Sequence, residues 1–316
     1  MDVPIIETKG LKKYFSVPRG ALHAVDGVDL SINPEETLGV VGESGCGKST
    51  LGRVILGLLP ATDGQILYNG ESIFDERGRK KQNIYKEMQM IFQDPFSSLN
   101  PRLSIHDLIA EPMHVQRVLS DETKVRERVL ELMDLVGLSE RYVNTYPHEL
   151  DGGRRQRVGV ARALALDPRF IVCDEPVSAL DVSIQAQILN LIMDLQERKG
   201  LAYMFITHNL CVVKHISTNI MVMYMGQVVE YAPKEQLFEK QYHPYSQALL
   251  SAIPLPELNR GKERIVLSGE VSNPINPKPG CRFAPRCKYA TEKCTGCDIP
   301  LVEIEKGRKV ACTLYT

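Results

Sequence analysis

A glycine-rich motif of the form GxxxxGK[ST] reads Gly42-Glu43-Ser44-Gly45-Cys46-Gly47-Lys48-Ser49 in this chain. A short apolar run, Thr37–Val41, precedes the motif, and a helical pattern of apolar residues, Ser49–Leu59, follows it. Glycines at this spacing let the backbone curl until successive N–H groups point at phosphate oxygens. The positive N-terminal end of the following helix favours the same anion. The motif therefore predicts a strand, a phosphate-binding loop and a helix.

A second chemical motif ends another apolar strand. Phe170–Cys173 is followed directly by Asp174 and Glu175. In a phosphate-loop protein the first carboxylate would orient Mg²⁺ and the second would act as general base on a water molecule. On the loop itself, Lys48 would reach the β- and γ-phosphates, with the Ser49 hydroxyl on Mg²⁺ and Thr50 close to the phosphates. Together the two motifs predict hydrolysis of a nucleoside triphosphate.

Length and composition narrow the class of protein. The 316 residues include 38 Lys and Arg and 39 Asp and Glu, which gives a net charge of −1. The chain therefore lacks the overall positive charge that is typical of proteins that bind nucleic acid. No apolar run reaches the roughly 18 residues that span a bilayer. The N-terminus lacks the pattern of a secretory signal. We therefore expect a soluble, cytoplasmic chain without a nucleic-acid partner, whose role at a membrane would depend on partner proteins.

The pattern along the chain predicts an α/β fold with an insertion. Strands are expected at Ile5–Val17, Ala24–Ile32 and Thr37–Val41, and a solvated loop at Asp75–Lys86. The segment Ile105–Leu138 has a helical pattern and interrupts the α/β alternation. Proline-rich, irregular sequence begins near residue 254. Further strands are expected at 88–92, 170–173, 202–206, 220–224 and 227–231, and helices at 154–166 and 184–197.

With both motifs in place, the intervening residues resemble the ABC transporter ATPase family. Gln93 resembles the Q-loop glutamine, a sensor of Mg²⁺ and water, and His208 resembles the switch histidine that contacts the γ-phosphate. Residues 146–157 resemble the signature region, and Ser178-Ala179-Leu180-Asp181 resembles the D-loop. Phe15, with Tyr14 as the alternative, fits the aromatic residue that stacks on adenine.

A narrower resemblance is to the oligopeptide/dipeptide importer ATPases. It rests on residues 93–102, which read QDPFSSLNPR, and on the cysteine-containing tail. The resemblance implies a RecA-like P-loop core of ABC type with a β-subdomain, within residues 1–253. It also implies an inserted helical subdomain at about 95–155 and a small C-terminal extension at 254–316. Such proteins bind ATP and Mg²⁺ and work as dimers, each ATP lying between one chain's phosphate loop and the other chain's signature.

The signature departs from the family pattern. Where the family has Ser-Gly-Gly-Gln, this chain has Asp151-Gly152-Gly153-Arg154. An ionised aspartate cannot donate a hydrogen bond to the partner's γ-phosphate and carries the same sign of charge. One hypothesis is a weakened signature within an asymmetric heterodimer. The alternative is that Asp151 and Arg154 pair with each other and the site works normally.

Five of the eight cysteines lie in the last 36 residues. Cys281, Cys287, Cys294 and Cys312 match the cysteines in the tails of peptide-importer ATPases, some of which hold a [4Fe–4S] cluster, while Cys297 is additional. Four thiolates in a proline-rich tail would suit such a cluster or Zn²⁺. The spacing alone also allows free thiols or disulfides.

The resemblance implies a transport function. The chain would hydrolyse ATP at the cytoplasmic face of the cell membrane, beside a second ATPase subunit and two membrane permease subunits, with an external solute-binding protein choosing the cargo. Dipeptides or oligopeptides are the cargo that the family suggests. Import of nickel or another small solute is one alternative, and a soluble ABC-type clamp that transports nothing is the other.

Overall fold

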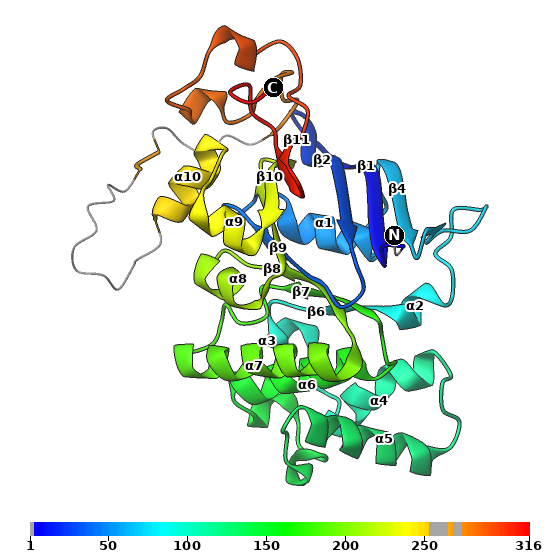
Figure 1. Ribbon diagram of the computed structural model, residues 1–316. Coiled ribbons are helices and arrows are strands. Elements are labelled where there is room, and N and C mark those ends of the chain that lie inside the picture. The colour runs from blue at the N-terminus through cyan, green and yellow to red at the C-terminus, as the bar shows by residue number, and fades with distance from the viewer. Residues whose placement is uncertain (1–2, 253–264, 268–273) are drawn as a thin grey trace. The chain divides into compact units, whose positions relative to one another are not determined.

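The computed structural model describes residues 3–252, 265–267 and 274–316. By contacts between Cα atoms the chain divides into two compact units. The first unit consists of Met1–Ile32, Glu36–Ser72 and Phe205–Thr316, and the second of Asn33–Glu35 and Ile73–Met204. The predicted domain boundary near residue 254 falls outside the described residues and stays a prediction. We describe each unit by itself, with the element labels of Figure 1.

The first unit contains an antiparallel sheet in the order β2-β1-β4-β5 (Figure 1). Its long strands pair because apolar side chains alternate along them, with Ile6, Leu11, Val28 and Ile32 all buried. The four strands are β1 (Ile6–Val17), β2 (Gly20–Ile32), β4 (Asp63–Tyr68) and β5 (Glu71–Ser72).

A second set of strands in the first unit has the order β11-β12-β10-β9-β3. β3 (Thr37–Val41) is buried at every residue and pairs in parallel with β9 (Asn219–Tyr224), as expected for a strand covered on both faces. The other strands are β10 (Gln227–Pro233), β11 (Val302–Glu305) and β12 (Arg308–Val310); the helices are α1 (Lys48–Ile55), α8 (Leu210–Ile216), α9 (Lys234–Glu239) and α10 (Pro244–Ser251).

The second unit combines two parallel strands with helices. β6 (Met88–Ile91) pairs in parallel with β7 (Phe170–Asp174), and β8 (Ala202–Ile206) begins in this unit and ends in the first. Asp or Ser side chains cap four of its helices by accepting a backbone N–H in the first turn. The helices are α2 (Ile84–Glu87), α3 (Pro95–Ser98), α4 (Ile105–Val115), α5 (Glu122–Leu135), α6 (Gly152–Leu164) and α7 (Val182–Lys199).

Three sequence-based expectations about elements were wrong. The helix after the phosphate loop ends at Ile55 and not at Leu59, because Gly57 adopts a left-handed φ of 63° and ends the helix. The charged loop expected at Asp75–Lys86 includes the start of α2. The tail is less irregular than predicted: β11 and β12 form a hairpin that continues the sheet, with Val310 opposite Glu230 of β10.

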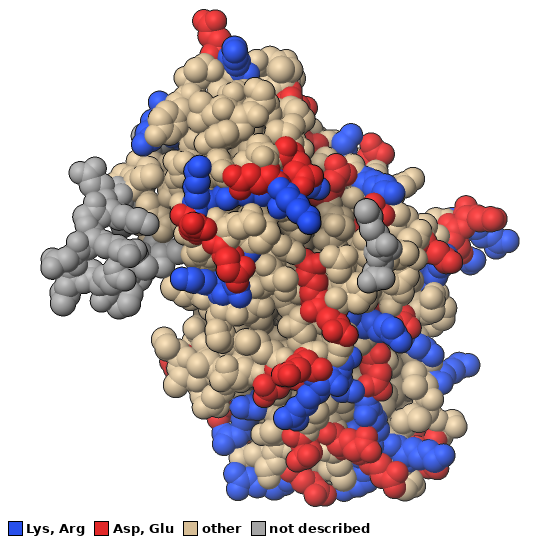
Figure 2. All heavy atoms as spheres, viewed as in Figure 1, with Lys and Arg blue, Asp and Glu red and all other residues tan. Residues whose placement is uncertain are grey.

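The surface in Figure 2 mixes acidic and basic side chains, and neither sign forms a continuous field in that view. This agrees with the near-neutral net charge of the chain. Among the described residues, no helix combines the length and apolar character that crossing a membrane requires.

Candidate functional site

The phosphate loop connects β3 to α1 in the first unit. Gly42, Gly45 and Gly47 have φ angles of 154°, 77° and 104°, in the region that disfavours side chains. At Gly47 the need for glycine is also steric, because a Cβ atom there would lie 1.9 Å from the backbone oxygen of Ala24. The loop therefore has the curled backbone that the motif predicts.

Lys48 folds back over the loop. Its Nζ donates to the backbone oxygens of Gly42 and Glu43, each at 2.9 Å, and lies 3.7 Å from the Cys46 sulfur. The Cys46 oxygen accepts the N–H of Gly226 at 2.8 Å, which ties the loop to the turn after β9. Burial raises the pKa of the Cys46 thiol. Lys48 is thus held at the centre of the loop, where its charge can face a polyphosphate.

Gln93 contacts Glu175 of the acidic pair Asp174 and Glu175 in the second unit. Asp174, the last residue of β7, is buried, while Glu175 is half-buried with a left-handed φ of 46°. Gln93 donates from Nε2 to Oε2 of Glu175 at 3.1 Å. A non-glycine residue with positive φ stores strain that is common at functional sites. The geometry therefore links Gln93 directly to Glu175.

The signature residues begin α6. Asp151 is the N-cap: its carboxylate accepts the backbone N–H of Arg154 at 2.8 Å and forms an ion pair with the same residue's guanidinium. The two glycines pack against the next segment, because a Cβ on Gly153 would lie 2.7 Å from the side chain of Ile184. In the turn after β7, which resembles the D-loop, the Ser178 hydroxyl donates to the backbone oxygen of Glu175 at 3.1 Å. The pairing of Asp151 with Arg154 is the arrangement that the second sequence hypothesis described.

The other residues that the sequence analysis predicts to contact a nucleotide lie in the first unit. His208 is exposed in the loop between β8 and α8. Phe15 is half-buried with the Lys13 ammonium 5.0 Å from its ring centroid. The alternative, Tyr14, stacks on His23 with ring centroids 3.7 Å apart, and its hydroxyl bonds to Asp26. Each ring therefore has a neighbouring group within the chain, and the choice between Phe15 and Tyr14 stays a prediction.

The tail cysteines occupy one compact segment. The Cys281 N–H donates to the Cys294 oxygen at 2.8 Å, and burial raises the pKa of the Cys281 thiol, with Cys294 and Cys312 adding to the shift. All cysteines are free thiols. Among residues 3–252, 265–267 and 274–316, no three His, Cys, Asp or Glu side chains are close enough together to hold a metal ion. As placed, the four thiols do not form the ligand set that the sequence predicts.

Two residues near the phosphate loop were missed by the sequence analysis. The Tyr245 hydroxyl and the Arg286 guanidinium both contact Glu43. Neither belongs to a short motif, and they are 202 and 243 residues away from Glu43 in the chain. No spacing rule could therefore have found them.

Comparison with known proteins identifies the family of the chain. The family model for the ABC transporter matches residues 25–178, and the model for the oligopeptide/dipeptide transporter C-terminal region matches residues 229–294. Among solved structures, the dimeric post-hydrolysis state of the ATP-binding cassette MJ0796 with ADP and Pi has a TM-score of 0.65 at 28% identity. That match covers 72% of this chain and 98% of the other.

Relatives match along nearly the whole chain. The putative oligopeptide transport ATP-binding protein YkfD of Bacillus subtilis is 47% identical, over 99% of this chain and 96% of its own length. OppF of the same organism, an oligopeptide transport ATP-binding protein, is 52% identical over 84% and 87%. The dipeptide transport ATP-binding protein DppF of Haemophilus influenzae is 46% identical over 98% and 97%.

These matches and the loop geometry define the class: the chain is an ATP-binding cassette of the ABC transporter family, and it is an ATPase. The α/β fold of ABC type expected from the sequence is confirmed. Within that family the chain belongs to the oligopeptide/dipeptide transport ATP-binding proteins, as the tail and residues 93–102 predicted.

Proposed function

We propose that this chain hydrolyses MgATP to drive the import of dipeptides or oligopeptides through separate membrane subunits. The observation that carries the proposal is its 45–52% identity to peptide-transport ATPases over both the cassette and the tail. The proposed assembly contains a second ATPase subunit, two membrane permeases and an external solute-binding protein. The chain would bind peripherally at the cytoplasmic face of the membrane.

The proposed chemistry assigns one step to each group. Lys48 and the N–H groups of the loop bind the β- and γ-phosphates, with Ser49 and Thr50 at the start of α1. Glu175 accepts a proton from the water whose oxygen attacks the γ-phosphorus, and ADP leaves. The hydrogen bond from Gln93 to Glu175 supports this role, because it orients the carboxylate. Mg²⁺, held by Ser49 with Asp174 and Gln93, would neutralise phosphate charge.

Five further residues complete the proposed nucleotide contacts. Phe15 stacks on adenine, and His208 contacts the γ-phosphate. Asp151, Gly152 and Gly153 face the ATP bound by the partner subunit. We propose a heterodimer, because a signature that begins with a carboxylate suits an unequal pair of sites. The Asp151–Arg154 pair supports the competing hypothesis of normal function, because it offsets the negative charge.

We also propose, on the cysteine pattern, that the tail binds a [4Fe–4S] cluster, with Zn²⁺ as the alternative. The role of the cluster would be structural, because a bound metal stabilises a short segment that has only a small hydrophobic core. Metal and sulfide analysis of anaerobically purified protein tests this. Protein without iron, zinc or labile sulfide would refute it.

The function is tested by comparing Glu175→Gln with the wild type. The amide cannot accept the proton of the attacking water, so we expect unchanged MgATP binding and a loss of hydrolysis of roughly 100-fold or more, as for a general base. Reconstitution with the membrane subunits in vesicles tests the cargo, measured as ATP-dependent uptake of labelled dipeptides. Uptake of nickel or another small solute with no uptake of peptides would contradict the proposed cargo.

A further inference from the structure

Glu43, the second residue of the phosphate loop, is held by two residues of the C-terminal part of the chain. Its backbone N–H donates to the Tyr245 hydroxyl at 2.8 Å. Its carboxylate accepts two hydrogen bonds from Arg286, with Nη1 at 2.9 Å from Oε2 and Nη2 at 3.2 Å from Oε1. Both the backbone and the side chain of Glu43 are therefore fixed from outside the loop.

The ion pair is not an ordinary surface contact. The side chain of Arg286 is 10% exposed and that of Glu43 is 26% exposed. A bidentate guanidinium–carboxylate contact with little access to water is stronger and more directional than an exposed pair. The guanidinium group of an arginine keeps its positive charge throughout the pH range in which proteins are folded. Arg286 therefore stays charged and holds the carboxylate in one orientation.

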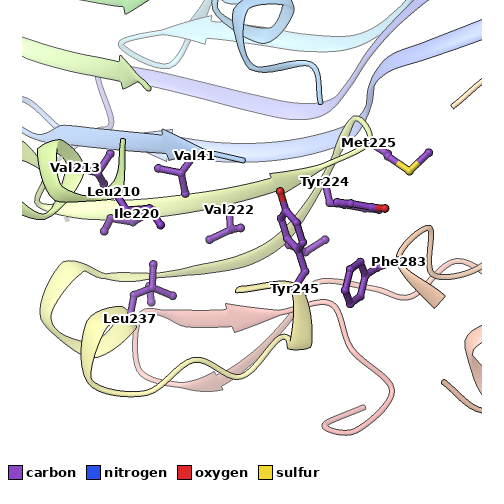
Figure 3. Close-up of a cluster of buried hydrophobic side chains, with 12 residues drawn as sticks. Val41, Leu210, Val213, Ile220, Val222, Tyr224, Met225, Leu237, Tyr245 and Phe283 are labelled. Carbon is purple, nitrogen blue, oxygen red and sulfur yellow. The ribbon is translucent and has the colours of Figure 1, made fainter. Parts of the chain in front are cut away.

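An aromatic cluster keeps these partners in place (Figure 3). The ring of Tyr245 packs against Tyr224 with centroids 4.7 Å apart and against Phe283 at 5.5 Å. Tyr245 and Phe283 are buried, and Val41, the residue immediately before the loop, belongs to the same cluster. The Tyr245 hydroxyl thus comes from a packed core, and Arg286 contacts the same cluster by donating a hydrogen bond to the Tyr224 hydroxyl at 3.3 Å.

The contacts to Glu43 affect the rest of the loop through Lys48. The Lys48 ammonium donates to the backbone oxygen of Glu43 at 2.9 Å. Tyr245 binds the N–H of the same residue, so that N–H is directed at the tyrosine. Glu43, Tyr245, Arg286 and His208 also line one cavity of about 900 Å³. Residues of the C-terminal part, Tyr245 and Arg286, therefore line the same cavity as Glu43 of the phosphate loop and His208.

We propose that Tyr245 and Arg286 are positioning residues for the phosphate loop. They fix Glu43 so that the following N–H groups and Lys48 are already arranged for the phosphates before ATP binds. Preorganisation of this kind lowers the cost of binding, because the loop loses less freedom when the ligand arrives. The proposal rests on the proposed function of the loop as the ATP site, and it gives the C-terminal part a role in nucleotide affinity.

Three conservative variants of the intact chain test the proposal: Tyr245→Phe, Arg286→Gln and Glu43→Gln. Tyr245→Phe removes one oxygen and leaves the ring in its cluster. We expect each variant to raise the Kd and KM for MgATP by about tenfold, the effect of losing a hydrogen bond that involves a charged or buried group. In Tyr245→Phe and Arg286→Gln, the kcat at saturating ATP should change by less than about twofold, because the lost contact weakens the ground state and the transition state equally.

Arg308→Gln is the matched control. Arg308 is a buried arginine of the tail hairpin that pairs with Glu230 and Glu305, not with the loop. This variant perturbs the tail without touching Glu43, so its Kd for MgATP should equal that of the wild type. An equal weakening in Arg308→Gln, at matched folded fraction by circular dichroism, would show that general loss of tail structure is responsible and would overturn the proposal.

A double-mutant cycle gives the second readout. Because Glu43 and Arg286 act as one pair, Glu43→Gln/Arg286→Gln should bind MgATP about as well as either single variant. Arg286→Lys keeps the charge but loses the bidentate contact, so its affinity for MgATP should lie between those of Arg286→Gln and the wild type. Wild-type affinity in Tyr245→Phe and Arg286→Gln would also overturn the proposal. Failure of the wild type itself to bind MgATP would instead contradict the function of the loop.

Discussion

His243 offers a prediction about the acid stability of the fold. It is 1% exposed and precedes the first turn of α10, where its Nδ1 accepts the backbone N–H of Tyr245 at 3.1 Å. The backbone N–H of His243 donates to the carboxylate of Glu230 at 2.9 Å. The centroid of its ring lies 5.7 Å from that of Phe283. A protonated imidazole has no acceptor nitrogen, so acid would remove the cap of this helix.

Burial lowers the pKa of His243 from 6.5 to about 4. The unfolded chain therefore binds a proton below pH 6.5 that the folded chain binds only near pH 4, so stability falls as the pH is lowered through this window. At about 1.4 kcal/mol per pKa unit, the full loss between pH 7 and pH 4 is roughly 3 kcal/mol. Above pH 6.5 the histidine is neutral in both states and contributes no pH dependence.

The assay is urea unfolding of the isolated chain at several pH values from 7.5 to 4.5, for the wild type and His243→Asn. Asparagine can accept the N–H of Tyr245 as a helix cap but does not titrate. The difference in unfolding free energy between the two proteins should change by roughly 1.4 kcal/mol per pH unit below pH 6.5. His215→Asn, at an exposed histidine of α8, controls for the loss of a histidine as such. Parallel curves for the wild type and His243→Asn across this range would refute the reasoning.

Three other changes give separate tests. Gly47→Ala places a methyl group 1.9 Å from the Ala24 oxygen, and about 1–3 kcal/mol of strain should weaken MgATP binding roughly tenfold or more by calorimetry; wild-type affinity would contradict the loop geometry. Glu230→Ala removes the buried carboxylate that accepts the backbone N–H of His243 and faces Arg308, which keeps Glu305 as a partner. The unfolding free energy should fall by about 1–3 kcal/mol, the cost of a buried donor left unsatisfied, and a fall below about 0.5 kcal/mol would exclude a structural role. Asp151→Ser keeps a helix cap and should raise the ATPase rate of the assembled transporter; no increase would count against the weakened signature.

The sequence was most informative where structure depends on near neighbours. The strand–loop–helix around Gly47 could be predicted because a left-handed glycine, an apolar strand and a helix start all fall within about 20 residues. The strands β7 and β8 are fully buried and read as unbroken apolar runs. The helix α8 was not predicted, although its cap was readable: Asn209 accepts the N–H of Cys211 at 3.0 Å.

Pairing between distant segments was the part that the sequence did not reveal. The tail hairpin has strands of only four and three residues, and its place in the sheet depends on β10, about 80 residues earlier. Strands this short carry too few residues for an alternating pattern to stand out. The same limit applies to the site, where Gln93 and Glu175 were predicted by resemblance but their direct hydrogen bond was not.

The contacts of Glu43 give a physical reason for the cassette and its tail to occur in one chain. A phosphate loop needs only local residues to curl, but its exact orientation depends on what holds its first residues. Here the holding groups follow the last strands of the core: Tyr245 on α10 and Arg286 just before Cys287. A change that loosens the tail around Arg286 should therefore alter the affinity for ATP first, because Arg286 contacts Glu43 of the phosphate loop directly.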